Sequence, residues 1–278
     1  MLKINKILFL ILLVLGPLFV LNAQEGKWSA KGDAAYQKGN YSKAISLYKK
    51  GVKAEEGASC YGLGLCYLEG HGTSQDLNEA AFYLYRGAEL SNLKASAEML
   101  VRLADKGNAD AQMLAGHCYQ VGYGLEEDLS KAIQYYQMSR KYNLKYLVEA
   151  LQLTIDEELT SASSASQSGS DTPGDEIFRF ATQAPEFPGG VQALVNMLAQ
   201  NAVYPEYCRA REIKGTVLIE FVVEADGQVS HVKVKLSCFP LLDNEALRVV
   251  SKQPRWEPGI LDGKPVRCYY AVPMRFAM

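Results

Sequence analysis

The feature that most constrains this chain is an internal repeat. The segment Cys66–Ala80 recurs as Cys118–Ala132, 52 residues further along, with Cys-Tyr, Gly-x-Gly, Asp-Leu and Ala in the same places. A tighter copy, Gly32–Tyr48, precedes them, and a partial copy, Ala97–Gly107, lies between them. Each copy has the pattern of two helices joined by a glycine turn. Such units cannot bury their apolar faces alone, so we expect them to stack into an all-α solenoid.

The repeat residues resemble the tetratricopeptide superfamily. The two longer copies, in which a Gly-x-Gly loop precedes Asp76 or Asp128, resemble its Sel-like bacterial branch, and both aspartates stand where they would cap the second helix of a unit. We place this repeat domain at residues 24–159 and expect a last helix at about 144–159 to cap the stack. The resemblance implies a protein–protein scaffold that recruits another protein.

Residues 1–23 have the pattern of a targeting segment. Lys3 and Lys6 form a basic start, the run Ile7–Val20 is apolar, and Ala23 offers a small residue at a cleavage site. The apolar run is shorter than the ~20 residues that a membrane-spanning helix usually needs. We therefore expect a cleaved signal peptide and a periplasmic protein. The alternative is an uncleaved segment that anchors the protein in the inner membrane.

A change of composition separates the repeats from the rest of the chain. Residues 160–176 hold the run Thr160–Gly174, which is rich in Ser, with Ala, Gly and Pro, and has no hydrophobic period. Such a composition is typical of a flexible linker. We therefore expect the repeat domain and a second domain at residues 177–278 to fold independently.

The second domain begins with the pattern of short strands and a hairpin. Residues 177–180 alternate apolar and basic side chains, as a short strand does. Two longer strands, at about 216–223 and 229–236, flank the strong hairpin signal Asp226-Gly227. The alternation in the second of them places Leu236 on the inward face.

A helix and a last strand complete this domain. Asp243 is expected to cap a helix at 244–252, and the last strand follows at about 266–276. The crossover between the hairpin and the last strand must be right-handed. We therefore expect a small α+β domain with a three-stranded antiparallel sheet, the first strand in the middle, helices on one face and the last strand at an edge.

The residues of this domain resemble the TonB C-terminal domain family over about 177–278. The leading loop Pro185–Gly190 resembles the version common in the Bacteroides group. The other matching motifs occur in consistent order and spacing: Tyr204-Pro205, Gly215-Thr216-Val217, Asp226-Gly227, Leu242-Asp243, Arg255-Trp256-Glu257-Pro258-Gly259 and Val272-Pro273-Met274-Arg275-Phe276.

The resemblance implies docking to TonB-dependent outer-membrane receptors, whose N-terminal segment adds as a strand to the edge of this domain's sheet. It also implies contacts at the start of the Tyr204-Pro205 pair and at the residue before it, which is Val203 here. Many members of the family have Gln where this chain has Val203. The side-chain contact that Gln makes is therefore absent from this chain's expected site.

The last strand offers a main-chain docking surface. Successive residues of an edge strand direct their N–H and C=O groups to alternate sides. Pro273 has no N–H, so it fits best with that position facing away from the central strand. Arg267, Tyr269 and Ala271 share its parity, and we expect a receptor segment to pair with them. The alternative is that Pro273 merely blocks edge-to-edge aggregation.

Candidate chemistry elsewhere points away from catalysis. The chain has no nucleophile elbow, phosphate loop or paired-carboxylate motif, and the spacing of its six Cys fits no zinc pattern. His71 lies in a repeat loop, His231 on a strand, and His117 beside Cys118, where helical geometry separates the two side chains by about 100°. We expect no enzyme activity, no cofactor and no metal. A net charge of −2 argues against nucleic acid or an anionic membrane as the main partner.

These patterns favour a TonB-type periplasmic protein in outer-membrane transport that binds receptors through its last strand. The alternative is a scaffold of the same fold that binds receptors or other envelope proteins without being energised. Full TonB proteins carry an uncleaved anchor with a Ser and a His, which couples them to a proton-driven inner-membrane motor. Residues 1–23 contain neither residue, so the motor proteins are the least supported of the expected partners.

Overall fold

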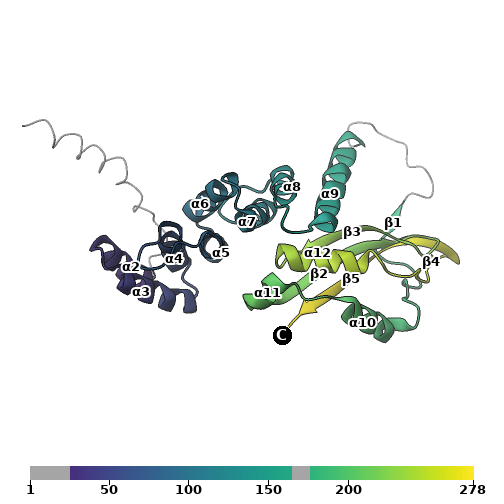
Figure 1. Cartoon of the computed structure of the whole chain (residues 1–278). Helices are drawn as coiled ribbons and strands as arrows, with labels where there is room; N and C mark the ends of the chain where they lie inside the picture. The colour runs from purple at the N-terminus through teal and green to yellow at the C-terminus, as the bar shows by residue number, and fades with distance from the viewer. Residues whose placement is uncertain (1–25, 165–175) are drawn as a thin grey trace, which may run out of the picture. The chain divides into compact units, whose positions relative to one another are not determined.

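The computed structural model describes residues 26–164 and 176–278 (Figure 1). The expected signal segment at 1–23 lies outside the described residues, as does most of the expected linker. The chain divides into two compact units, Met1–Leu100 and Val101–Met278. None of the described helices is both long and apolar enough to cross a membrane.

The first unit consists of helix pairs that pack on one another. Helix α2 packs against α3, α3 against α4, and α4 against α5, which confirms the expected all-α repeats. The side chain of Asp76 caps α5 by accepting hydrogen bonds from the N–H groups of Asn78 and Glu79. The helices are α2 (Lys27–Gln37), α3 (Tyr41–Lys53), α4 (Gly57–Glu69) and α5 (Leu77–Ser91), and the division between the units falls within α6 (Lys94–Asp105).

Small residues let neighbouring repeats meet closely around Tyr48. The ring of Tyr48 is buried, and its hydroxyl donates a hydrogen bond to Asp33 at 2.6 Å. A Cβ atom on Gly32 of α2 would lie 2.3 Å from this ring, and one on Gly62 of α4 would lie 2.5 Å from it. These glycines therefore explain how three helices can share one aromatic core residue.

The second unit continues the repeats and then forms the sheet domain. Asp128 caps α8 by accepting a hydrogen bond from the Lys131 N–H at 2.9 Å. Helix α9 runs to Ser164, so the first residues of the segment expected to be a linker are helical. The remaining helices of the repeats in this unit are α7 (Ala109–Val121), α8 (Leu129–Met138) and α9 (Lys145–Ser164).

The sheet has β2 at its centre, as expected, and two short strands that were not expected to pair with the last strand. The strand order is β1-β5-β2-β3, and β4 also pairs with β5. Helices α10 (Gly190–Asn201), α11 (Glu206–Ala210) and α12 (Pro240–Val250) complete the domain. The strands are β1 (Ile177–Phe178), β2 (Gly215–Val223), β3 (Val229–Leu236), β4 (Gly259–Leu261) and β5 (Lys264–Phe276).

The core of the sheet domain lies under the inward face of β2. Val217, Ile219 and Phe221 are fully buried, and the Phe221 ring packs edge-on against Trp256 with centroids 5.5 Å apart. On β3 the expectation for Leu236 is wrong, because its side chain is 58% exposed. Two register shifts between β2 and β3 break the strict alternation on which that expectation depended.

Asp243 caps α12 from inside the helix rather than from its start. Helix α12 begins at Pro240, earlier than expected, and the Asp243 carboxylate reaches back to accept hydrogen bonds from the N–H groups of Cys238 and Phe239 at 3.0 and 3.4 Å. The two N–H groups precede the first turn and would otherwise be unsatisfied.

The last repeat helix packs directly against the sheet domain. Helix α9 contacts both α12 and β3. The Asn244 side chain accepts a hydrogen bond from the Leu147 N–H at 3.1 Å and donates one to the Asn143 carbonyl at 3.0 Å. Asn244 thus caps α9 from another element. This packing differs from the expected independence of the two parts, which was inferred from linker composition alone.

A buried polar chain extends this joint to α7. His117 Nε2 lies 2.8 Å from the Ser237 hydroxyl, which donates to Asp243 at 2.5 Å. Burial lowers the pKa of His117 to about 3. Burial also raises the pKa of Asp243 to about 7, although the hydrogen bonds from Cys238 and Ser237 favour its charged form. Burial at this contact therefore favours the uncharged forms of both His117 and Asp243.

Candidate protein-docking edge

Strand β5 is paired along one side and only partly along the other. On the first side β2 pairs with it in unbroken register, from Gly215 opposite Phe276 to Val223 opposite Cys268. On the side away from β2, the short strand β1 pairs with Arg267 and Cys268. Beyond them, from Tyr269 to Phe276, no other described strand pairs with this side of β5. This stretch is the open edge.

Arg267 is therefore not part of the open edge, although it was an expected docking residue. It lies opposite Ile177 of β1, and its guanidinium Nε binds Glu224 Oε2 at 2.7 Å. Both its main chain and its side chain already have partners within the domain. Of the expected docking residues on β5, Tyr269 and Ala271 therefore lie on the open edge and Arg267 does not.

The residues of the open edge alternate between buried and exposed side chains. Ala271, Pro273 and Arg275 are exposed, whereas Val272 and Met274 are buried. Because β2 and β5 pair without a register shift, the main-chain directions also alternate without interruption. Pro273 has no N–H and fits best where its nitrogen faces outward, away from β2. In that arrangement the N–H groups of Tyr269 and Ala271 face outward too.

An apolar groove of about 230 Å³ lies between α10 and the end of β5. Its α10 wall includes Val195, which is 50% exposed, and its floor includes Pro273 and Met274. Val195 thus leaves apolar surface in water at the wall of this groove. The full lining is Val195, Leu198, Ala199, Ala202, Pro273, Met274, Arg275 and Phe276.

Val203 and Tyr204 lie at the same end of β5 as this groove. The Tyr204 ring packs edge-on against Phe276 with centroids 6.0 Å apart, and its hydroxyl donates to the Ile213 carbonyl at 2.6 Å. Val203 is 64% exposed, and its N–H donates to Glu245 at 2.6 Å. Tyr204 thus positions the end of the strand, whereas Val203 offers an apolar side chain to solvent.

The expected site residues follow one strand instead of forming a cluster. Arg267 and Phe276 stand at opposite ends of a stretch that is roughly 30 Å long at about 3.3 Å per residue. Tyr269 and Ala271 lie between them, and Val203 and Tyr204 lie beside the far end. An arrangement of this length fits an extended peptide better than a small molecule.

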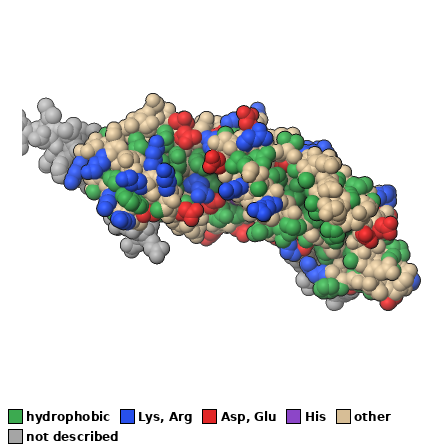
Figure 2. All heavy atoms as spheres, turned by 90° about the horizontal axis from the view of Figure 1, so that it is seen from below, with side chains coloured by type: hydrophobic (Ala, Val, Ile, Leu, Met, Phe, Trp, Pro, Cys, Tyr) green, Lys and Arg blue, Asp and Glu red, His purple; other side chains and the backbone are tan. Residues whose placement is uncertain are grey.

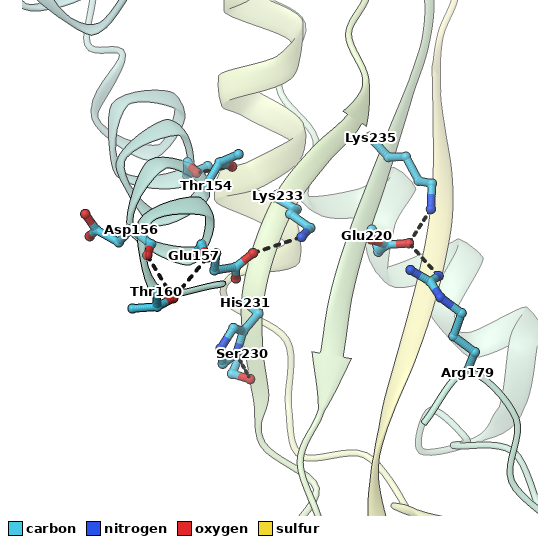
Figure 3. A network of polar contacts seen from close by, with 11 residues as sticks. Thr154, Asp156, Glu157, Thr160, Arg179, Glu220, Ser230, His231, Lys233 and Lys235 are labelled. Carbon is cyan, nitrogen blue, oxygen red and sulfur yellow. Dashed lines mark hydrogen bonds and ion pairs between the residues drawn. The ribbon is translucent and has the colours of Figure 1, made fainter. Parts of the chain in front are cut away.

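An ion network on the outer face of the sheet holds the start of the open edge (Figure 3). Arg179 lies over the Tyr269 ring at 4.7 Å and approaches the buried Glu220 at 3.6 Å. Lys235 binds the same carboxylate at 2.5 Å. Burial by itself raises the pKa of Glu220, but Lys235 and Arg179 outweigh it and keep the pKa below its ordinary value. Sequence reasoning missed Arg179, whose alternating context indicated only a strand.

The other outer strand of the main sheet, β3, has a helix beside it. Figure 3 shows α9 next to β3, with Glu157 of the helix joined to Lys233 of the strand at 3.1 Å. At the open edge of β5, by contrast, α10 stands across a groove from the end of the strand. An unpaired strand edge of this kind can accept a further strand.

The other two histidines, His71 and His231, contact neighbouring side chains within the fold. His71 Nδ1 lies 2.7 Å from the Tyr36 hydroxyl and 2.9 Å from Glu69, and its ring stacks on Tyr41. His231 lies beside Ser230 on β3. Within residues 26–164 and 176–278, no group of three His, Cys, Asp or Glu side chains could hold a metal ion. None of the six cysteines forms a disulfide bond, and all but Cys238 are buried.

Two family models match segments of this chain. Residues 200–278 match the family model of the Gram-negative bacterial TonB protein C-terminal, and residues 26–55, 57–92 and 109–141 match that of the Sel1 repeat. Protein TonB of Vibrio cholerae is 38% identical over 76 residues, which are 27% of this chain and 31% of that protein.

Two solved structures are similar to part of this chain. One is a Sel1 repeat protein from Oxalobacter formigenes, with 24% identity, 46% of this chain and 61% of that chain covered, and a TM-score of 0.23. The other is a protective antigen of uropathogenic Escherichia coli that displays an SLR fold, with 19% identity, 54% and 34% covered, and a TM-score of 0.25. The chain thus carries Sel1 repeats within residues 26–141 and a domain of the TonB C-terminal family at residues 200–278.

Proposed function

We propose that this is a periplasmic TonB-type protein that docks to outer-membrane receptors by strand addition at the open edge of β5. The observation that carries this proposal is the stretch from Tyr269 to Phe276, which has no strand partner on its outer side among the described residues. The membership of residues 200–278 in the TonB C-terminal family supports the class of partner. The Vibrio cholerae protein is matched over only 31% of its length, so its whole activity is not carried over.

The proposed ligand is an extended segment near the N-terminus of a receptor. Its main chain pairs with the outward groups of Tyr269 and Ala271. Its side chains alternate, and those on the inner face enter the groove between α10 and β5. The segment should therefore carry aliphatic residues at every second position near the groove.

The Sel1 repeats are proposed to recruit a second protein. Because α9 packs on α12 and β3, the last repeat and the docking domain move together. A partner held by that repeat is thereby kept at a fixed distance from the open edge, which raises its effective concentration near a docked receptor.

A charge introduced into the groove tests whether the receptor peptide binds there. Val195→Asp places a carboxylate on the apolar wall, where burial against an aliphatic side chain is costly. We expect receptor-peptide affinity to fall about tenfold or more. Asn196→Asp adds the same charge to the same helix on a residue that does not line the groove, and it should bind normally. Fluorescence anisotropy with a labelled peptide measures both. Equal affinities for the two variants would contradict groove binding.

The second candidate function is a scaffold that occupies receptors without transmitting force. The sequence favours it in one respect, since residues 1–23 lack the Ser and His that couple full TonB proteins to the motor. Mass spectrometry of the mature N-terminus separates the two functions. A start at Gln24 supports the scaffold, and an intact Met1 in the inner membrane supports the energised form.

A further inference from the structure

The first repeat carries a strong local positive charge that the net charge of −2 for the whole chain hides. Residues 27–53 contain seven lysines and no arginine, with Asp33 as their one acidic residue. Figure 2 shows Lys and Arg side chains gathered over the first helices of the repeats, at the left of the view. Five of these lysines form one surface around Trp28, here called the lysine patch: Lys27, Lys31, Lys49, Lys50 and Lys53.

Trp28 organises the patch. The ammonium groups of Lys27, Lys31 and Lys50 lie 5.2, 5.6 and 5.2 Å from the centre of its ring, which is within the range of cation–π attraction. Lys50 also lines a shallow groove on α3, together with Lys49 and Lys53. The ring is itself partly exposed, so apolar and cationic groups occur on the same surface.

Two acidic residues near the patch, Asp33 and Glu56, serve internal contacts, and a third, Glu55, is exposed. Asp33 accepts the Tyr48 hydroxyl at 2.6 Å. Glu56 accepts the N–H groups of Trp28 and Ser29, both at 3.1 Å, and so caps α2 from the neighbouring repeat. The five lysines are exposed, and none forms an ion pair with a carboxylate in the described part of the chain.

We propose that the lysine patch docks the first repeat onto an anionic phospholipid surface. A terminal repeat needs a polar outer surface for solubility, but mixed charges would supply that. Protein interfaces that recognise carboxylates favour arginine, which binds them with two parallel hydrogen bonds, and disfavour lysine. A patch of lysines alone, with a tryptophan among them, instead matches the composition of surfaces that lie on lipid headgroups.

The proposal predicts how a loss of charge affects binding. Each lysine near an anionic surface strengthens adsorption about fivefold. Neutralising four of them should weaken binding on the order of a hundredfold or more. The variant carries Gln at Lys31, Lys49, Lys50 and Lys53, and a charge-matched control carries Gln at four exposed lysines outside the patch: Lys94, Lys106, Lys145 and Lys264.

Trp28 fluorescence in the full-length protein provides the readout. Trp256, the second of the two tryptophans, is 4% exposed in the core, so a change in emission reports Trp28, and Trp28→Phe should remove it. Vesicles of phosphatidylglycerol with phosphatidylcholine should shift the emission to the blue, and vesicles of phosphatidylcholine alone should not. The shift should fade as salt rises from about 0.1 M to about 1 M, because the Debye length falls from about 10 Å to about 3 Å.

Three results would overturn the proposal. The first is equal binding of the patch variant and the control to phosphatidylglycerol. The second is an equal response to both lipids, which would indicate insertion of apolar residues without charge recognition. The third is no response of Trp28 to either vesicle, as expected if the patch serves an acidic protein or only keeps the repeat soluble.

Discussion

Replacing Ala271 with proline is expected to weaken receptor docking strongly while the domain stays folded. The change removes the outward N–H at the centre of the open edge, and it leaves a carbonyl of the incoming strand without a donor. An unsatisfied buried carbonyl costs about 1–3 kcal/mol, which corresponds to roughly 5- to 150-fold in affinity. Ala271 is exposed, so the ring has room. Peptide affinity by calorimetry and the thermal midpoint are the two measurements.

Val272→Pro is the matched control for this variant. Val272 is buried and has the opposite parity, so its N–H is expected to bond to Ile219 of the central strand β2. Proline there should unfold or strongly destabilise the domain. If Ala271→Pro unfolded the domain and Val272→Pro did not, the N–H of Ala271 would face β2 and that of Val272 would face outward, which is the reverse of the proposal.

Opposite pH dependences are expected when either end of the buried polar chain is replaced. His117 has a folded pKa of about 3 against an ordinary value of 6.5, so its contribution to stability is lost as pH falls from about 6.5 toward 3. Asp243 has a folded pKa of about 7 against 3.8, so its contribution is present at low pH and lost as pH rises toward 7. Between about pH 4 and 6.5 the two contributions oppose each other.

Single replacements should therefore separate the two slopes. In Asp243→Asn, stability relative to the natural protein should rise between pH 4 and 6.5, since only the His117 contribution remains. In His117→Gln the relative stability should fall over the same range. Over this range each change should reach about 3 kcal/mol, since the slope is about 1.4 kcal/mol for each pH unit. Urea unfolding at several pH values measures this, and curves parallel to that of the natural protein would contradict the buried uncharged pair.

Local patterns predicted the elements of this chain well. The Asp226-Gly227 hairpin and the rule for right-handed crossovers placed β2 at the centre of the sheet. The Asp76 and Asp128 caps followed from their positions before the second helix of each repeat. Each of these depends on residues that are close in sequence, or on a general rule of topology.

Contacts between distant segments were not predictable in this way. Ile177 pairs with Arg267 across most of the domain sequence, and nothing in a two-residue strand specifies that partner. Asn244 has the composition of a solvated helix residue, yet it caps α9. Linker composition likewise described only the linker, and not the surfaces of α9 and α12 that pack together.

Hydrogen exchange at single amides tests the central claim of receptor docking at β5. Without ligand, the amides of Tyr269 and Ala271 should exchange quickly, while that of Val272 should be slow because it pairs with β2. A saturating synthetic peptide from the N-terminal segment of a TonB-dependent receptor should slow exchange at Tyr269 and Ala271 and leave Val272 unchanged. If both amides still exchanged quickly at saturation, this edge would not be the docking site.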